Sequence, residues 1–162
     1  MVRKRILVID DDEAVVKSMA RLLEFEGYQV DTAGTGGEAV EKSKRNFYNL
    51  ALIDIRLPDM EGTQLLTRMS DTTPRMVKII LTGYPSMNYA IDAVNKGADG
   101  FITKPVIDTD EFLQKIKEHL RKQEESEHYS EQKVAEFVET RFKQLDAEKK
   151  DPDSKNTSIS DS

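Results

Sequence analysis

Cysteine and tryptophan are both absent from the 162 residues, and basic side chains do not outnumber acidic ones. Without cysteine the chain can form neither a disulfide framework nor a cysteine-based zinc site, which fits a reducing compartment. The net charge of −6 provides no basic face of the kind that binds nucleic acid. The apolar run at 6–9 is too short for a signal peptide or a membrane span. We therefore expect a cytoplasmic protein without direct contacts to nucleic acid or membrane.

Apolar runs alternate with amphipathic stretches along the first two thirds of the chain. The pattern predicts strands near 5–9, 29–33, 50–55, 77–81 and 99–103, each followed by a helix, at 13–26, 36–45, 63–70, 86–96 and 108–123. Strict alternation of this kind indicates an α/β fold, in which helices cover both faces of a parallel sheet. The apolar strands lack a period of two, as expected for parallel strands that are buried on both sides.

The last forty residues have a different composition. Residues 121–150 are dense in charge and carry a sparse apolar stripe, formed by Val134, Phe137, Val138, Phe142 and Leu145. Ser130 could cap a separate helix here, or the fifth helix could simply run on. Residues 151–162 are polar and lack aromatic side chains, which predicts disorder. We therefore divide the chain into a domain at 1–122, a charged helical extension at 123–150 and a disordered tail at 151–162.

Acidic residues follow two of the predicted strands. Asp10 and Asp11 come after the first strand and Asp54 ends the third. In an open parallel sheet ligands bind at the carboxyl ends of the strands, where the winding direction reverses. With a strand order of 2-1-3-4-5 the first and third strands are neighbours there, so the three carboxylates would converge. Because close carboxylates repel one another, such a cluster favours a hard divalent cation, and we expect Mg²⁺.

Two further polar residues end strands at the same edge. Thr82 ends the fourth strand and Lys104 follows the fifth. A hydroxyl and an ammonium both suit the oxygens of a phosphoryl group. All predicted strand ends except the second thus supply a group that is useful in phosphoryl transfer.

Four sequence blocks resemble a known family. Residues 6–12 (ILVIDDD), 52–62 (LIDIRLPDMEG), 81–83 (LTG) and 97–105 (GADGFITKP) are similar, in this order, to the response-regulator receiver domain of two-component signalling. The resemblance covers residues 3–122. It implies a doubly wound, flavodoxin-like sheet of five parallel strands in the order 2-1-3-4-5, here with a C-terminal helical extension.

The resemblance also implies a role for each residue of the acidic cluster. Asp54 would be the phosphoacceptor, taking a phosphoryl group from the phosphohistidine of a sensor histidine kinase or a phosphotransfer protein. Asp11 would hold Mg²⁺ directly, Asp10 partly through water, and the backbone carbonyl of Arg56 would be a further ligand.

The remaining implied roles concern catalysis and switching. Lys104, before a peptide to Pro105 that is usually cis in the family, and Thr82 would contact the phosphoryl oxygens. Thr82 and Phe101 would then move, changing the face made by the fourth helix, fifth strand and fifth helix for a downstream protein target. Phe101 stands where the family often has tyrosine. Arg56 and Tyr84 are bulky at positions that modulate dephosphorylation, so we expect slow self-dephosphorylation and no turnover as an enzyme.

Two alternatives stay open at this stage. The pair Asp10 and Asp12 is similar to the nucleophile motif of haloacid dehalogenase-type phosphatases, although a late acidic pair and a cap domain are not evident. Residues 123–162 show neither a helix-turn-helix pattern nor a basic patch, so we expect output through protein contacts. A homodimer could form through the helical extension or through the face of the fourth helix, fifth strand and fifth helix.

Overall fold

The computed structural model describes residues 3–69, 72, 74–83 and 86–150. Five strands and five helices alternate along this part of the chain. The strands are β1 (Arg5–Ile9), β2 (Gln29–Ala33), β3 (Leu50–Asp54), β4 (Val77–Thr82) and β5 (Gly100–Thr103). The helices are α1 (Glu13–Phe25), α2 (Gly36–Arg45), α3 (Gly62–Arg68), α4 (Met87–Asn95) and α5 (Thr109–Lys150). The predicted disordered tail at 151–162 lies outside the described residues.

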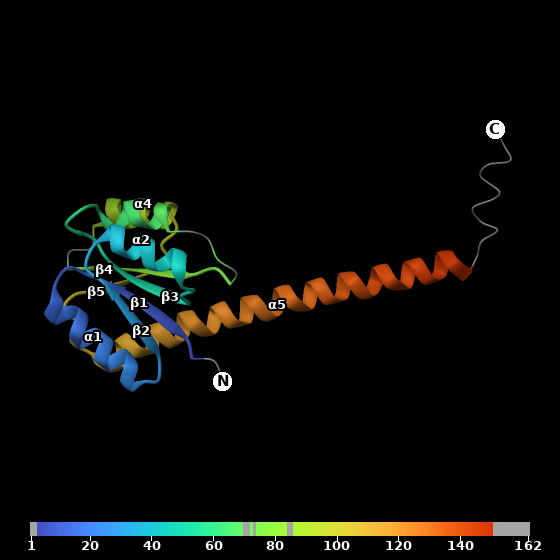
Figure 1. The fold of residues 1–162 in the computed structure, drawn as a ribbon, viewed down its shortest axis with the longest axis horizontal. Coiled ribbons are helices and arrows are strands. Elements are labelled where there is room, and N and C mark those ends of the chain that lie inside the picture. Colours follow the sequence, from blue (N-terminus) through green and yellow to red (C-terminus); the bar gives the residue numbers. More distant parts are fainter. Residues whose placement is uncertain (1–2, 70–71, 73, 84–85, 151–162) are drawn as a thin grey trace. The chain divides into compact units, whose positions relative to one another are not determined.

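The strands form one parallel sheet in the order β2-β1-β3-β4-β5, which confirms the predicted fold class. Each face of the sheet is covered by helices. One core cluster lies between the sheet and α2, α3 and α4, and the other lies between the sheet, α1 and the first part of α5. Figure 1 shows α2 and α4 on one face and α1 on the other. Both faces of β3 are buried, which explains its unbroken apolar sequence.

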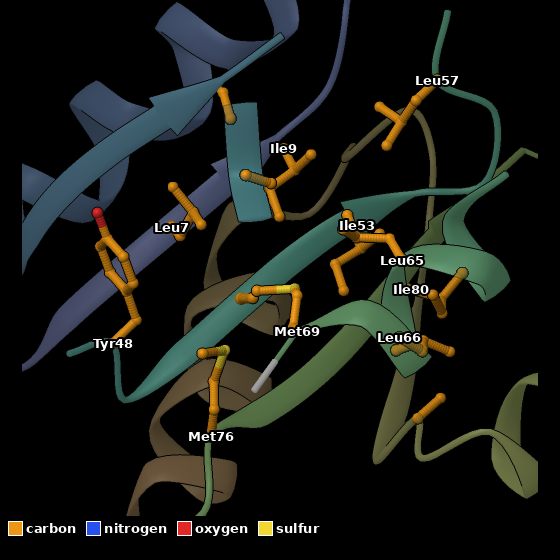
Figure 2. Close-up of a cluster of buried hydrophobic side chains, with 14 of the residues drawn as sticks. Leu7, Ile9, Tyr48, Ile53, Leu57, Leu65, Leu66, Met69, Met76 and Ile80 are labelled. Atoms are coloured by element: carbon orange, nitrogen blue, oxygen red, sulfur yellow. The ribbon is translucent and has the colours of Figure 1, made fainter. Parts of the chain in front are cut away.

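The first cluster contains side chains from all its layers. Figure 2 shows Leu7 and Ile9 of β1, Ile53 of β3 and the α3 side chains Leu65 and Leu66 within this cluster. These side chains are at most 2% exposed. Burial of this kind contributes about 1.5–3 kcal/mol to stability for each large apolar side chain. The cluster therefore stabilises the packing of α3 against β1 and β3.

Local capping fixes where several helices begin and end. The carboxylate of Asp12 accepts hydrogen bonds from the backbone N–H groups of Ala14 and Val15, so Asp12 is the N-cap of α1. Gly27 follows α1 with φ of +99° and Gly97 follows α4 with φ of +107°. Both lie in the left-handed region, which glycine adopts without strain, so each glycine ends the helix that precedes it.

The chain divides into two units after Gln123. In the first unit Gln123 is buried, and its side-chain N–H group donates to the backbone carbonyls of Asn49, at 2.9 Å, and Arg75, at 2.7 Å. In the second unit, α5 continues without a break through Ser130 to Lys150. Of the two alternatives for this segment, the continuous helix is therefore correct. Its apolar side chains are exposed, among them Val134, Phe137, Val138, Phe142 and Leu145.

None of the helices in the described part of the chain is long and apolar enough to cross a membrane. The long helix α5 is instead rich in charged side chains throughout its length.

Candidate functional site

Three carboxylates converge at the carboxyl edge of the sheet. Asp10 directly follows β1, Asp11 comes next, and Asp54 is the last residue of the neighbouring strand β3. One oxygen from each carboxylate can be chosen so that all lie within 4.8 Å of one another. The strand order places them there, because the ends of β1 and β3 are adjacent. The convergence expected from the sequence is therefore present.

The first of these carboxylates is held from two sides. Asp10 is 2% exposed, and its Oδ1 accepts a hydrogen bond of 3.0 Å from the backbone N–H of Asp12. Its Oδ2 accepts a hydrogen bond of 2.8 Å from the ammonium of Lys104. Asp11, by contrast, is exposed. The cluster thus joins a fixed carboxylate to one that can reorient toward a ligand.

Lys104 brings a positive charge to this cluster from beyond the end of β5. Its Nζ lies 2.8 Å from Asp10 Oδ2 and 3.1 Å from Asp54 Oδ1. The peptide between Lys104 and Pro105 is cis, as the family resemblance implied. Burial alone would lower the pKa of this ammonium, but its hydrogen bonds to the two carboxylates outweigh burial and raise the pKa. Lys104 is therefore protonated at neutral pH.

The carboxylate of Asp54 is in an unfavourable electrostatic setting. Its side chain is 12% exposed. Burial raises its pKa and the negative charge of Asp10 raises it further, although the hydrogen bond from Lys104 acts in the opposite direction. In the folded protein this carboxyl group therefore holds its proton more tightly than an exposed aspartate does. A cation bound beside Asp54 would stabilise its ionised form.

Thr82 and Phe101 occupy the strands on the other side of β3. Thr82 ends β4, is 2% exposed, and pairs in register with Thr103 of β5. Phe101 pairs in register with Ile80 and is partly buried against the core cluster beneath α4. Thr82 thus lies at the carboxyl edge of the sheet, and Phe101 lies between the sheet and α4.

A tight loop leads from Asp54 into α3. The N–H of Gly62 donates to the carbonyl of Ile55 at 2.6 Å, and Arg56 and Glu61 form an antiparallel bridge. A Cβ on Gly62 would lie 2.4 Å from the backbone oxygen of Asp54, so this position requires glycine. The loop holds the backbone of Arg56 next to the acidic cluster while its side chain is exposed. Tyr84, the second residue expected to modulate dephosphorylation, lies outside the described residues.

The comparison with protein families decides the identity of the fold. The profile described as "Response regulator receiver domain" matches residues 6–117, and these include the acidic cluster, Thr82 and Lys104. The chain belongs to the response regulator receiver family. This match confirms the resemblance expected from the four sequence blocks and lends no support to the dehalogenase alternative.

Solved receiver structures resemble this chain closely. A CheY-like response regulator receiver domain protein from Methanospirillum hungatei JF-1 is 49% identical, with a TM-score of 0.73, covering 77% of this chain and 99% of that one. A response regulator from Burkholderia pseudomallei, solved with a phosphorylated aspartic acid, a calcium ion and citrate, is 34% identical, with a TM-score of 0.63. That match covers 68% of this chain and 64% of the other.

Among curated proteins, the transcriptional regulatory protein GlrR of Escherichia coli K12 is 36% identical over 115 residues. The match covers 71% of this chain but 26% of GlrR. The similarity therefore concerns the receiver domain, and most of that relative has no counterpart in the matched segment.

One residue that positions the receiver site was missed in the sequence. The carboxylate of Asp59 accepts hydrogen bonds from the N–H groups of Gly36, at 2.8 Å, and Gly37, at 2.9 Å. These bonds lower the pKa of Asp59 and fasten the loop after β3 to the start of α2. No local pattern in the sequence indicates this contact, because the two partners lie more than twenty residues away. The pair of glycines at the start of a helix was the available signal.

Proposed function

We propose that the chain is a phosphoacceptor in two-component signalling, with Asp54 as the residue that receives the phosphoryl group. The donor is the phosphohistidine of a sensor histidine kinase or a phosphotransfer protein, and the setting is the cytoplasm. The observation that carries the proposal is the meeting of three carboxylates and the Lys104 ammonium within a single cluster at the carboxyl edge of the sheet. The phosphorylated aspartic acid in the Burkholderia relative supports the same chemistry here.

The donor atoms of the cluster fit a magnesium ion. Carboxylate oxygens within 4.8 Å of one another, one of them on an exposed side chain, are the hard ligands that this ion prefers. Asp10, Asp11, Asp54 and the backbone carbonyl of Arg56 would hold Mg²⁺. When bound, the ion supplies positive charge that stabilises the oxygens of the group in transfer.

The residues of this chain carry out the transfer by attack and by positioning. One oxygen of the Asp54 carboxylate attacks phosphorus, a P–O bond forms, and the P–N bond of the phosphohistidine breaks. The electron pair of that bond stays with the departing imidazole. Lys104 stabilises the negative phosphoryl oxygens, because its ammonium already lies 3.1 Å from Asp54 and stays protonated. The hydroxyl of Thr82 donates a hydrogen bond to the same oxygens.

The phosphoryl group then changes a distant surface. It adds about one negative charge beyond that of the carboxylate. Thr82 moves toward this charge, and Phe101 turns into the space that Thr82 leaves. The face of α4, β5 and α5 changes in consequence, and a downstream protein reads it. The exposed α4 side chains Met87, Ile91 and Val94 provide an apolar contact area on this face.

The same proposal covers decay and assembly. We further propose that water hydrolyses the aspartyl phosphate slowly and that Arg56 and Tyr84 are the residues that modulate this step. The receiver domain spans 1–122 and the helical extension 123–150. A homodimer forms either through the extension or through the face of α4, β5 and α5. Direct contact with nucleic acid is not part of this function.

Phosphorylation of the purified chain tests the proposal. Incubation with a small phosphodonor such as acetyl phosphate and Mg²⁺ should add one phosphoryl group, and peptide mapping should place it on Asp54. Asp54→Asn should abolish the modification. Asp12→Asn is the matched control, because asparagine is an equally good N-cap and the control should be phosphorylated normally. A phosphoryl group on Asp10, or its loss in the Asp12 variant, would instead indicate the dehalogenase reaction.

A further inference from the structure

Tyr89, on α4, has a buried hydroxyl group without a hydrogen-bond partner among the described residues. The contrast with Tyr48 is informative. Tyr48 lies in the same core cluster, but its hydroxyl donates to Asp31 at 2.6 Å. Buried tyrosine hydroxyls generally find such a partner. The hydroxyl of Tyr89 is therefore an exception that calls for a physical reason.

The surroundings of this hydroxyl point toward the phosphorylation site. Burial raises the pKa of Tyr89, and the carboxylate of Glu61 raises it further. The carboxylate of Asp54 also raises the pKa of Tyr89, although less than Glu61 does. The hydroxyl of Thr63 is near enough to lower the pKa, yet the two hydroxyls do not form a hydrogen bond. Tyr89 thus lies beside the loop that leads from Asp54 into α3.

Phenylalanine would satisfy the core better than tyrosine if packing alone mattered at this position. A buried hydroxyl that lacks a partner loses its hydration without compensation, and this destabilises the folded state. The hydroxyl would become favourable in a conformation in which an acceptor for its hydrogen bond lies close by. Phe101, the other partly buried aromatic residue near α4 in this cluster, has no hydroxyl to offer. Among the described aromatic residues of this cluster, Tyr89 is therefore the one whose hydroxyl is still free to donate, since that of Tyr48 is bonded to Asp31.

We propose that Tyr89 is a positioning residue of the loaded site: its hydroxyl is unpaired while Asp54 is unmodified and donates to an anionic oxygen once a phosphoryl group is attached. The acceptor is a phosphoryl oxygen or the Glu61 carboxylate, both of which are anionic oxygens beside the same loop. The new hydrogen bond draws α4 toward the loop after β3, and so links phosphorylation to the position of that helix. This inference rests on the proposed phosphoacceptor role of Asp54.

The proposal predicts that Tyr89→Phe makes the unmodified protein more stable but weakens its affinity for a phosphoryl mimic. Without Mg²⁺ and phosphoryl group, the variant should melt at a higher temperature than the wild type, because an unpaired buried hydroxyl has been removed. In the presence of Mg²⁺, its half-saturating concentration of beryllium fluoride, which stands in for the phosphoryl group, should rise about three- to tenfold, the equivalent of one lost hydrogen bond. If Tyr89 served only in packing, its replacement would change the stability and the affinity in the same direction or would change neither.

The experiment uses the full chain labelled with ¹³C at the tyrosine ζ carbon, whose NMR shift reports the hydrogen bonding of each hydroxyl. The Tyr89 signal, assigned by its loss in the variant, should move when beryllium fluoride and Mg²⁺ are added. Tyr129→Phe is the matched control, because this side chain is 62% exposed and should leave affinity unchanged. The acceptor is identified by repeating the Tyr89→Phe measurement in a Glu61→Gln background. If Tyr89→Phe no longer weakens the affinity there, Glu61 is the acceptor. If the loss of affinity persists, the acceptor is a phosphoryl oxygen.

The outcomes separate the two proposals. A wild-type chain that fails to respond to beryllium fluoride would refute the phosphoacceptor role of Asp54, and the role of Tyr89 with it. A wild type that responds, with an affinity that Tyr89→Phe leaves unchanged, would refute the role of Tyr89 alone. A lower melting temperature of the unloaded variant would also overturn it, since the hydroxyl would then be paired before loading.

Discussion

Replacing Lys104 with methionine tests how the acidic cluster is held together in the absence of metal. The ammonium donates to Asp10, whose side chain is 1% exposed, and lies 3.1 Å from Asp54, whose side chain is 12% exposed. Hydrogen bonds between charged groups each contribute about 1.5–3 kcal/mol. Because 22% of the lysine side chain is exposed, solvent screens part of this energy, and about 2–3 kcal/mol is a reasonable total. That loss corresponds to roughly 10 °C in melting temperature for a domain of this size.

The pH of the measurement follows from the pKa of Lys104. Its pKa is higher in the folded protein than in the unfolded chain, so its stabilising contribution is fully present below the unfolded value. The contribution disappears only as the pH rises through the higher folded value. Thermal unfolding followed by circular dichroism at pH 7 in EDTA therefore captures the whole effect.

Added magnesium should then partly restore the variant. Without the ammonium the carboxylates lack a cation, so Mg²⁺ should raise the melting temperature of Lys104→Met more than that of the wild type. Lys96→Met is the matched control, because it removes an exposed ion pair with Asp92 and should cost at most about 1 kcal/mol. Equal stability of the two variants in EDTA, or an equal response to Mg²⁺ in the wild type and Lys104→Met, would refute this account of the cluster.

Other substitutions test individual features of the receiver domain. Asp54→Asn should raise the melting temperature at pH 7 without metal, because a carboxyl group with a raised pKa destabilises the fold wherever it is ionised. Gly62→Ala should cost about 3 kcal/mol in urea unfolding, since its Cβ would meet backbone at 2.4 Å; a change below 1 kcal/mol would contradict this. Asp59→Ala should speed hydrogen exchange of the two glycine amides that begin α2, with little change in the sheet. Gln123→Ala should cost about 2 kcal/mol, because the buried carbonyl of Asn49 and the partly buried carbonyl of Arg75 lose their donor; unchanged thermal unfolding would show that water replaces it.

The sheet and its acidic edge were predictable because the signals are local. Residues 50–54 form an apolar run that ends in an aspartate, and residues 6–10 do the same. Burial on both faces removes the period of two, so each run indicates a central parallel strand. Once β1 and β3 are neighbours, the convergence of Asp10 and Asp54 follows from geometry alone.

Other features depend on contacts that no local pattern reveals. Asp59 meets the start of α2 across more than twenty residues, and Gln123 meets the carbonyl of Asn49 across more than seventy. The course of the chain beyond Gln123 was ambiguous for a different reason. Ser130 suits a helix N-cap, yet 124–150 has no glycine or proline and many glutamate and lysine residues, which allow α5 to continue. The high helix propensity of 124–150 thus outweighed the N-cap signal of Ser130.

The charge balance of the site explains why a hydroxyl donor such as Tyr89 would matter. Within the described residues, three carboxylates face one ammonium, which leaves two excess negative charges when all are ionised, and a single divalent cation balances them. Phosphorylation of Asp54 exchanges one negative charge for about two, so the loaded site regains an excess of about one. Neither Lys104 nor the metal can supply more positive charge. Neutral donors can stabilise this excess, and the two donors proposed above to move toward it, Thr82 from β4 and Tyr89 from α4, would carry the signal to the surface.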